Sequence, residues 1–251
     1  VVIYSQSEEL PSSDPVTAQI VPGNKKALLI LDNGETIDLK TSTNVELKEK
    51  DGTLIQGDSA ALNYSHASTG KIDKPVYNKI YVPRGGEYQL TLSDGSKVHL
   101  NAMSSIRFPV QFAKDKRVVE LEGEAYFEVS KAGQPFIVET KAVNVQVMGT
   151  TFNLSAYTNE ECRTTLVSGS VRVQTDNGNS RILKPSEQAC IASGSDQISV
   201  RQVDTAFYTS WIQGKINFKD QRLEDIMQNL SRWYNMEVVY DNEKTKNLRF
   251  G

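Results

Sequence analysis

The side chains with the clearest potential for chemistry are two glutamates, Glu122 and Glu124, in the segment ELEGEAYFE. If this segment is a strand, both carboxylates lie on one face with their Cα atoms about 7 Å apart. Glycoside hydrolases use such carboxylate pairs. Here, however, the pair belongs to a ladder of acids from Glu120 to Glu128, close to the basic residues Lys114–Arg117. A solvated, salt-bridged strand face is therefore the better interpretation than a hydrolase active site.

The other residues of reactive type are isolated. His99 stands in a predicted strand without a second histidine, cysteine or nucleophile motif beside it, which favours an exposed or hydrogen-bonded histidine over a catalytic base. The run Ser168–Ser170 lacks the GxSxG pattern and indicates a turn. No predicted helix follows Gly85–Gly86, which excludes a phosphate-binding loop. We therefore predict that the chain is not an enzyme and needs no cofactor.

The cysteines and histidines do not form a metal motif. Cys162 and Cys190 lie far from His66 and His99 in the sequence, whereas a structural zinc needs about four nitrogen or sulfur ligands at short spacings. Both cysteines fall in predicted strands. Two alternatives remain open: two free thiols, or one disulfide, which would need Cα atoms roughly 5.5 Å apart and would favour an oxidising compartment.

Composition argues against two further classes of protein. The net charge is −3 and the sequence pI is about 5.6, with Lys and Arg scattered among acids, so no surface for nucleic acid is expected. The mean hydropathy is −0.43, and no apolar run approaches the length of about 18 residues that spans a membrane. A membrane helix, if the protein has one, is expected upstream of Val1.

Alternating segments separated by turns predict a β-rich body. The clearest strand is Val118–Val129, in which Gly123 marks a bulge or a close approach of another backbone. Turn signals recur about every 8 to 12 residues, as in all-β domains. The turns are Asp32–Gly34, Asp51–Gly52, Asp94–Gly95 and Asn177–Gly178, and the further strands are Phe136–Glu139, Val143–Val147, Thr151–Ala156, Arg163–Val167, Ser170–Thr175, Arg181–Lys184, Gln188–Ala192 and Ile198–Val203.

Two hairpins resemble each other, and this similarity bears on the architecture. The segment LLILDNGETIDL aligns with QLTLSDGSKVHL, sharing Leu31/Leu92, Gly34/Gly95 and Leu39/Leu100. A repeated hairpin favours stacked, solenoid-like β-structure. We predict a mainly β fold: an irregular lead-in over 1–21, then an all-β sandwich or β-roll over 22–208.

The pattern changes after Trp211. Lys215–Phe218 is predicted as a strand, Asp220 as a helix N-cap and Asn235 as a left-handed C-cap. Between the caps, apolar residues recur with helical spacing, and the strands Met236–Tyr240 and Asn247–Phe250 follow. We predict a partial α/β module of β-α-β type over 212–251, truncated because one helix on a few strands buries little apolar surface. The helical stripe is Leu223, Ile226, Met227, Leu230, Trp233 and Tyr234.

The aromatic end of this helix has two interpretations. Trp233 and Tyr234 either pack against the strands of the module or belong to a surface left apolar for a partner, since Trp and Tyr are frequent anchors of interfaces. A strand edge next to them would allow binding by strand addition. The candidate partner-binding residues are Leu223, Ile226, Leu230, Trp233, Tyr234, Met236, Val238 and Tyr240.

Several segments of the sequence resemble those of the FecR family of transmembrane anti-sigma regulators, in the form common in Bacteroidetes. Residues 211–242 are similar to the start of that family's second module, which resembles the secretin/TonB short N-terminal (STN) domain. Position 99, usually Trp in this subfamily, is His here. The matching words are VPRGGEYQLTLSDGSKVHLNAMSSIRFP (82–109), VVELEGEAYFEV (118–129), PFIVET (135–140), VMGTTFNLSAY (147–157), TTLVSGSVRV (164–173) and LKPSEQA (183–189).

The resemblance implies a role in signalling by protein–protein contact. It implies the periplasmic part of a single-pass inner-membrane protein that receives the N-terminal signalling domain of an outer-membrane TonB-dependent transporter. The signal would reach a cytoplasmic extracytoplasmic-function (ECF) sigma factor through a membrane helix and a cytoplasmic segment that are absent from this sequence. The imported ligand, iron chelate or glycan, does not follow from the resemblance.

A carbohydrate-binding or surface-adhesion module is the alternative function, because all-β bodies of this size also serve that role. It would need an exposed aromatic platform, for which Tyr88, Tyr126 and Phe152 are the candidates. A hydrolase using Glu122 and Glu124 is a weaker rival. Neither alternative explains the predicted β-α-β tail.

Overall fold

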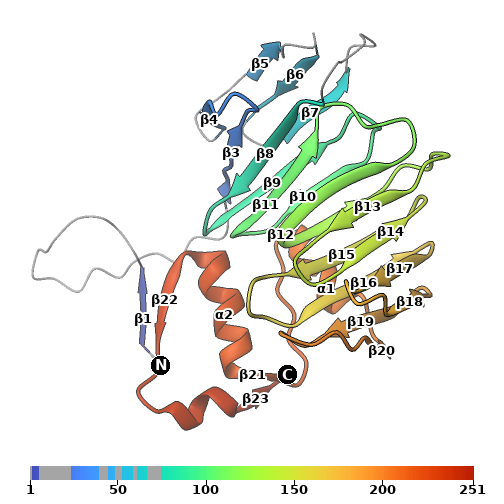
Figure 1. Ribbon diagram of the computed structural model, residues 1–251. Helices are drawn as coiled ribbons and strands as arrows, with labels where there is room; N and C mark the ends of the chain where they lie inside the picture. The colour runs from blue at the N-terminus through green and yellow to red at the C-terminus, as the bar shows by residue number, and fades with distance from the viewer. Residues whose placement is uncertain (1, 6–23, 40–44, 49–52, 59–60, 67–74) are drawn as a thin grey trace, which may run out of the picture.

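The computed structural model describes residues 2–5, 24–39, 45–48, 53–58, 61–66 and 75–251. The fold is mainly β, with 48% strand and 12% helix, as predicted. Figure 1 shows the strands stacked from β4 and β5 at one end to β20 at the other, with a small helical part at one side. We call residues 24–203 the β body and residues 206–251 the C-terminal module.

The first sheet of the β body extends from one end of the stack of strands to the other. All neighbouring strands pair antiparallel except β12 and β13, which are parallel. Its order is β4 (Thr36–Asp38), β3 (Leu28–Ile30), β8 (Tyr77–Val82), β11 (Ser104–Pro109), β12 (Arg117–Glu128), β13 (Phe136–Glu139), β14 (Asn144–Val147), β17 (Val171–Gln174) and β18 (Ser180–Leu183).

The second sheet runs alongside the first and shares β12 with it. Its pairs are antiparallel except β7 with β9, and the short β2 (Asn24–Lys25) also pairs parallel with β9. Its order is β5 (Val45–Lys48), β6 (Leu54–Gly57), β7 (Ala61–His66), β9 (Gly86–Thr91), β10 (Lys97–Leu100), β12, β15 (Thr151–Ala156), β16 (Cys162–Ser168), β19 (Glu187–Ile191) and β20 (Ser199–Gln202).

The shared strand β12 changes sheets at Gly123. Residues before it pair with β11 and β13, and residues from Gly123 onward pair with β15. Gly123 has φ +97°, and a Cβ there would lie 2.6 Å from the backbone Cα of Ser104. The predicted close backbone approach is confirmed. Because one strand belongs to both sheets, β12 joins the two sheets to each other.

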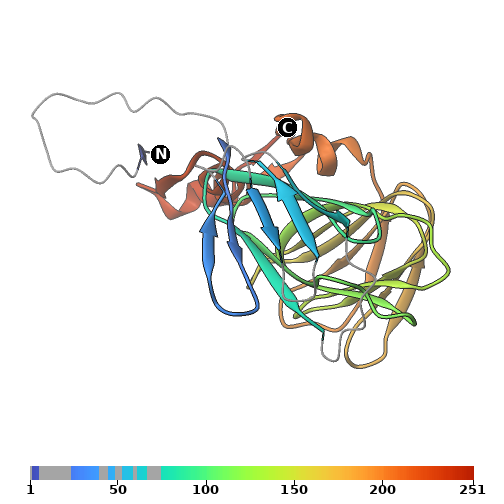
Figure 2. The same ribbon diagram turned by 90° about the horizontal axis from the view of Figure 1, so that it is seen from above.

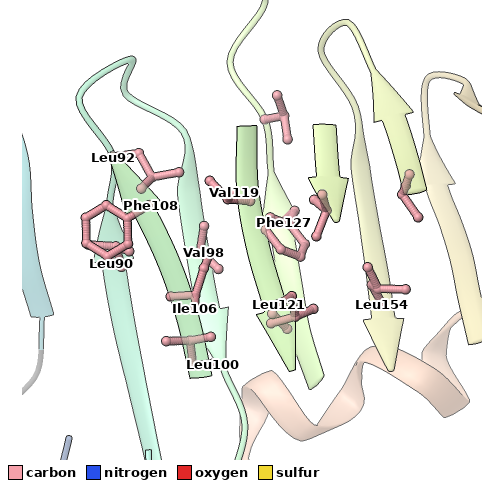
Figure 3. Close-up of a cluster of buried hydrophobic side chains, with 14 of the residues drawn as sticks. Leu90, Leu92, Val98, Leu100, Ile106, Phe108, Val119, Leu121, Phe127 and Leu154 are labelled. Atoms are coloured by element: carbon pink, nitrogen blue, oxygen red, sulfur yellow. The ribbon is translucent and has the colours of Figure 1, made fainter. Parts of the chain in front are cut away.

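Apolar side chains from both sheets fill the space between them (Figure 3). Phe127 of the second sheet stacks on Phe152 at 4.9 Å between ring centroids and meets Phe136 of the first sheet at 6.2 Å. Near the other end, Tyr64 meets Phe108 edge to face at 5.0 Å. This face-to-face packing makes the body a sandwich with a continuous core.

The predicted strands from residue 118 to residue 203 agree with the structure to within one residue at each end. The turns at Gly34, Gly95 and Gly178 share one hydrogen-bond pattern and a positive φ, which confirms the repeated hairpin. The predicted turn Asp51–Gly52 lies outside the described residues. Arg117, predicted in a solvated basic turn, is instead buried, and its guanidinium lies 2.5 Å from the Asp94 carboxylate.

The two cysteines are free thiols, so the disulfide alternative is wrong. Cys162 lies opposite Ile191 and Cys190 lies opposite Arg163 on the paired strands β16 and β19. Because side chains alternate between the faces of a strand, the two sulfurs point to opposite sides of the sheet. Burial raises the pKa of Cys162 to about 12 and also raises the pKa of Cys190.

The C-terminal module follows the body through a short helical segment, and two predictions for it are wrong. Lys215–Phe218 is not a strand, because no described strand lies beside it to pair with. Asp220 is not the N-cap; it has φ +48° and pairs with Arg249, and Arg222 takes the N-cap position. The elements are α1 (Ala206–Thr209), η1 (Ser210–Gln213), β21 (Gln221–Arg222), α2 (Leu223–Tyr234), β22 (Met236–Val239), η2 (Glu243–Asn247) and β23 (Arg249–Phe250).

The helix prediction Leu223–Tyr234 and the left-handed C-cap at Asn235 are confirmed. The strands around the helix pair differently from the prediction, because β21 pairs with β23 and not with β22. β22 instead pairs antiparallel with β1 (Val2–Ser5), which lies inside the lead-in predicted to be irregular. Figures 1 and 2 show β1 beside β22 at the side of the body.

Candidate functional site at the joint between body and module

The acidic ladder on β12 divides into surface carboxylates and one covered carboxylate. Glu120 pairs with Arg107, Glu122 pairs with Lys141, and Glu128 lies 3.6 Å from His99. Glu124 differs, because the C-terminal module covers its part of the sheet. The prediction of a solvated acidic face is correct for the other three glutamates and wrong for Glu124.

Two amides hold the Glu124 carboxylate. One oxygen accepts a hydrogen bond from Nδ2 of Asn101 and the other from Nδ2 of Asn153, each at 2.8 Å. Burial raises the pKa of Glu124, and the amide hydrogen bonds and the charge of Arg232 only partly offset this effect. The residue is therefore a half-buried acceptor whose neighbours would lose their partners without it.

The segment that follows the body covers this carboxylate. The indole N–H of Trp211 donates to Oδ1 of Asn153 at 3.1 Å, and Trp211 is itself buried. On the same outer face, Arg201 and Thr165 bind the buried side chain of Gln188. Hydrogen-bonded polar residues on the outer face of the second sheet thus hold the helical segment that contains Trp211 against this sheet.

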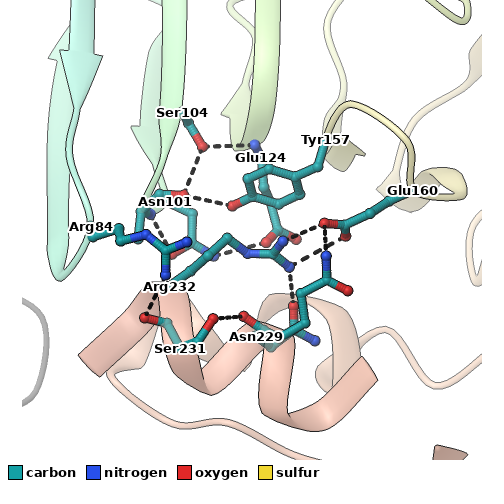
Figure 4. A network of polar contacts seen from close by, with 11 residues as sticks. Arg84, Asn101, Ser104, Glu124, Tyr157, Glu160, Asn229, Ser231 and Arg232 are labelled. Atoms are coloured by element: carbon teal, nitrogen blue, oxygen red, sulfur yellow. Dashed lines mark hydrogen bonds and ion pairs between the residues drawn. The ribbon is translucent and has the colours of Figure 1, made fainter. Parts of the chain in front are cut away.

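Helix α2 is attached to the body through Arg232 (Figure 4). Its guanidinium forms an ion pair with Glu160 and lies 3.9 Å from the ring centroid of Tyr157. The Tyr157 hydroxyl donates to the carbonyl of Ala102 at 2.8 Å, and Gln228 also donates to Glu160 at 2.8 Å. A cation on the helix therefore lies between a carboxylate and an aromatic face, both on the body.

The turn between β8 and β9 binds the last turn of α2. The N–H of Gly85 donates to the carbonyl of Arg232 at 2.7 Å, and Arg84 donates to the carbonyl of Ser231 at 3.4 Å. Gly85 has φ +63°, and a Cβ there would lie 3.2 Å from Cβ of Asn235. The sequence indicated a turn at this place, and its main-chain N–H pairs with the Arg232 carbonyl in the last turn of the helix, where carbonyls lack intrahelical donors.

A small cavity of about 80 Å³ lies inside the joint. Glu124 lines it but Glu122 does not, so the two carboxylates do not share this cavity as a hydrolase would require. Within the described residues, no cluster of His, Cys, Asp and Glu could hold a metal ion. The lining is Asn101, Glu124, Ser155, Tyr157, Phe207, Tyr208, Ser210, Trp211, Lys215, Ile216, Asn217, Phe218, Gln221, Asn229, Arg232 and Trp233.

The predicted partner-binding residues fall into two groups. Ile226, Trp233 and Met236 are buried, and Trp233 lines the cavity toward the body, which agrees with the interpretation as core packing. The half-buried group is Leu223, Leu230, Tyr234, Val238 and Tyr240.

A separate hollow of about 530 Å³ lies along α2 and β22. Its lining includes Val238 and Tyr240, together with Glu224, Gln228 and Ser231 from the polar side of the helix. These three residues were not among the predicted partner-binding residues, because that prediction was based on an apolar stripe and they are polar. Their spacing of four and three residues is the sequence signal that could have found them.

The three aromatics of the predicted carbohydrate platform do not form one. Tyr88 and Phe152 are buried in the core, and only Tyr126 is half-exposed, beside His99 on the outer face of the second sheet. The described part of the chain contains no helix long and apolar enough to cross a membrane.

Comparison with known proteins identifies the class of this β body and its module. Residues 78–172 match the family described as FecR protein, and residues 215–251 match the one described as FecR, C-terminal. No curated protein matches the chain.

Two solved structures, both of a proposed anti-sigma factor from Parabacteroides distasonis ATCC 8503, are similar to it. The first is 36% identical with a TM-score of 0.61, and the match covers 66% of this chain and 81% of the solved chain. The second is also 36% identical, with a TM-score of 0.60, and the match covers 62% of this chain and 74% of the solved chain. The chain belongs to the FecR family of anti-sigma factors.

Proposed function

We propose that this chain is the signal-receiving part of a transmembrane anti-sigma regulator. In this proposal it lies in the periplasm, as part of a single-pass inner-membrane protein. It contacts the N-terminal signalling domain of an outer-membrane TonB-dependent transporter. The signal then reaches an ECF sigma factor through segments outside this sequence. Membership of a regulatory family supports the role, and so does the separation of Glu122 from the cavity lined by Glu124.

The observation that carries the proposal is the way α2 is held. The helix contacts the body through Arg232 and Trp233, and Gln228 both lines the hollow along β22 and donates to Glu160 of the body. A partner bound along β22 therefore shares a helix with the joint. Any shift of α2 on binding changes the contacts of Arg232 with Glu160 and Tyr157. This gives the module a physical route to pass a binding event to the body.

The partner surface that we propose is the strand β22 with the exposed side of α2. Val239 is 48% exposed, and Val238 and Tyr240 line the hollow. A strand edge next to apolar side chains suits binding by strand addition, in which main-chain hydrogen bonds supply affinity and alternate side chains supply specificity.

Calorimetric titration against the signalling domain of the transporter encoded nearest to this chain tests the proposal. We expect saturable 1:1 binding that Val238→Pro weakens, because proline removes a main-chain donor and distorts the edge. Val200→Pro in β20, an exposed strand at the far end of the body, is the matched control and should bind like the natural chain. Absence of binding by the natural chain contradicts the relay, and equal binding by Val238→Pro contradicts the surface.

A further inference from the structure

The edge of β22 already carries a strand. All four residues of β1 pair with all four residues of β22, in antiparallel register from Val2 opposite Val239 to Ser5 opposite Met236. Among the described residues, these two strands form a sheet of their own. One edge of β22 is therefore occupied by the chain's own strand β1, and its other edge carries no described strand.

Three features make β1 a replaceable occupant. It is only four residues long, and a sheet of two short strands is marginal in water. Residues 6–23 separate it from β2 in the sequence, and among the described residues its strand pairing is with β22 of the module. Its sequence, Val-Ile-Tyr-Ser, is of the β-branched and aromatic type that any strand suited to this edge would share.

We infer that β22 is a strand-exchange site, at which β1 is the resting occupant and an extended, β-branched or aromatic segment of the partner protein is the signalling occupant. The inference rests on the proposed function, since it names how the partner reaches the surface. Both occupants would use the same main-chain groups of Met236–Val239, so they exclude each other. β1 then acts as an intramolecular competitor that sets the threshold for the partner.

The register of β1 on β22 predicts the form of the incoming strand. It should run antiparallel to β22 and place its residues as β1 does, with a position opposite Val238 that Ile3 now holds. A tethered segment competes at an effective concentration of the order of millimolar. A partner must therefore bind more tightly to a chain from which β1 is removed than to the natural chain. We expect about a tenfold difference for so short a strand.

The first test compares three chains of residues 1–251 in titrations with the transporter signalling domain. Ile3→Pro disrupts β1 by removing an N–H and restricting the backbone, whereas Ile3→Val keeps a β-branched residue and is the matched control. We expect Ile3→Pro to bind about tenfold more tightly and Ile3→Val to bind like the natural chain. Equal or weaker binding by Ile3→Pro would overturn the inference.

The second test needs no partner, so it separates this inference from the proposed function. Amide hydrogen exchange of residues 236–239 should be slow in the natural chain and in Ile3→Val, and faster in Ile3→Pro. A free peptide of residues 1–6 should restore the slow exchange. Unchanged exchange in Ile3→Pro overturns the inference even if the partner binds. Protection that disappears on dilution would also overturn it, because β1 would then come from a second copy of the chain.

If the transporter domain binds none of the chains while exchange behaves as expected, the proposed partner is wrong and the exchange site stands. A second measurement then decides whether the site takes other strands. Displacement of β1 by the peptide of residues 1–6 supports the site. Failure of this peptide to protect β22 in Ile3→Pro overturns it.

Discussion

The β body and the C-terminal module are held together in different ways. The body has a continuous apolar core with residues from both sheets. The last fully buried member of this core in the sequence is Ile191. The buried apolar residues of the module, such as Trp211 and Trp233, are not part of that cluster. Polar groups attach the module to the body: the Arg232 guanidinium, the indole N–H of Trp211 and the main-chain N–H of Gly85.

This difference suggests that the body resists displacement, whereas the module can move relative to it. Close-packed apolar cores have one good arrangement and resist displacement. Polar contacts can be exchanged for water at a small net cost, so a helix attached through them can shift without disturbing the core. The four predictions below test this contrast.

The largest effect is expected in the core of the body. Phe127→Ala removes a ring that packs between Phe152 and Phe136 and should lower the free energy of unfolding by about 3–5 kcal/mol. Denaturant unfolding measures it. Met148→Ala is the control, because Met148 is 51% exposed and its loss should change stability by less than about 0.5 kcal/mol. Similar values for the two variants would contradict a continuous core.

At the joint, the expected effect is local and smaller. Arg232→Met removes the ion pair with Glu160 and the contact with Tyr157, and should weaken the docking of the module by about 2 kcal/mol. Faster hydrogen exchange in α2, with unchanged exchange in the core strands, is the measurement. Arg249→Met removes an exposed pair with Asp220 and should leave α2 exchange unchanged. Uniform loosening of body and module would refute independent attachment.

A smaller, pH-dependent effect is expected from Glu124. Because its pKa is raised, the folded protein binds this proton more tightly than the unfolded chain. The contribution of Glu124 to the free energy of unfolding therefore falls as pH rises from the ordinary glutamate pKa through the raised pKa. Unfolding at a series of pH values should show this slope in the natural chain and not in Glu124→Gln.

Glu122 supplies the opposite sign as a control. The hydrogen bonds from Lys141 and Thr158 lower its pKa, so its contribution is present above the ordinary pKa and is lost as pH falls through the lowered pKa. Glu122→Gln should therefore remove a slope in the other direction. If the two glutamine variants change the pH profile in the same direction, the assignment of Glu124 as the covered carboxylate is wrong.

The smallest effect concerns the cysteines. Because both thiols are buried with raised pKa values, we expect neither to react with iodoacetamide in the folded protein, and reductant to leave stability unchanged. Mass spectrometry after labelling measures this. Ser193→Cys, at an exposed position, is the positive control and should be labelled quickly. Rapid labelling of Cys162 in the native state would contradict its place in the core.

Periodicity predicted much of this fold because its strands and its helix are locally encoded. The alternation in Val118–Val129 identified β12, and the apolar stripe identified α2 with its cap at Asn235. The same alternation also misled. Ile216 and Phe218 alternate like strand residues, but a strand needs a neighbour, and none of the described strands pairs with that segment.

The joint could not be predicted because its contacts are distant in sequence. Alternation places Glu124 on the outer face of a strand, but it does not say that Trp211 and Arg232 will cover that face. The pairing of Ile3 with Val238 is similarly remote. A lead-in rich in Ser, Asp and Pro offered no signal for a strand, because a four-residue strand acquires its structure only from the edge that it joins.

The pairing of β1 with β22 also has a consequence for the order in which the protein forms. Val2 faces Val239, so nearly the whole chain lies between the two partners, whereas most strands of the body pair with near neighbours along the chain. Closing so long a loop costs entropy that only the assembled body reduces. Synthesis proceeds from the N-terminus. Of the two paired strands, β1 is therefore made long before β22, and its pairing occurs only after α2 and β22 have been built.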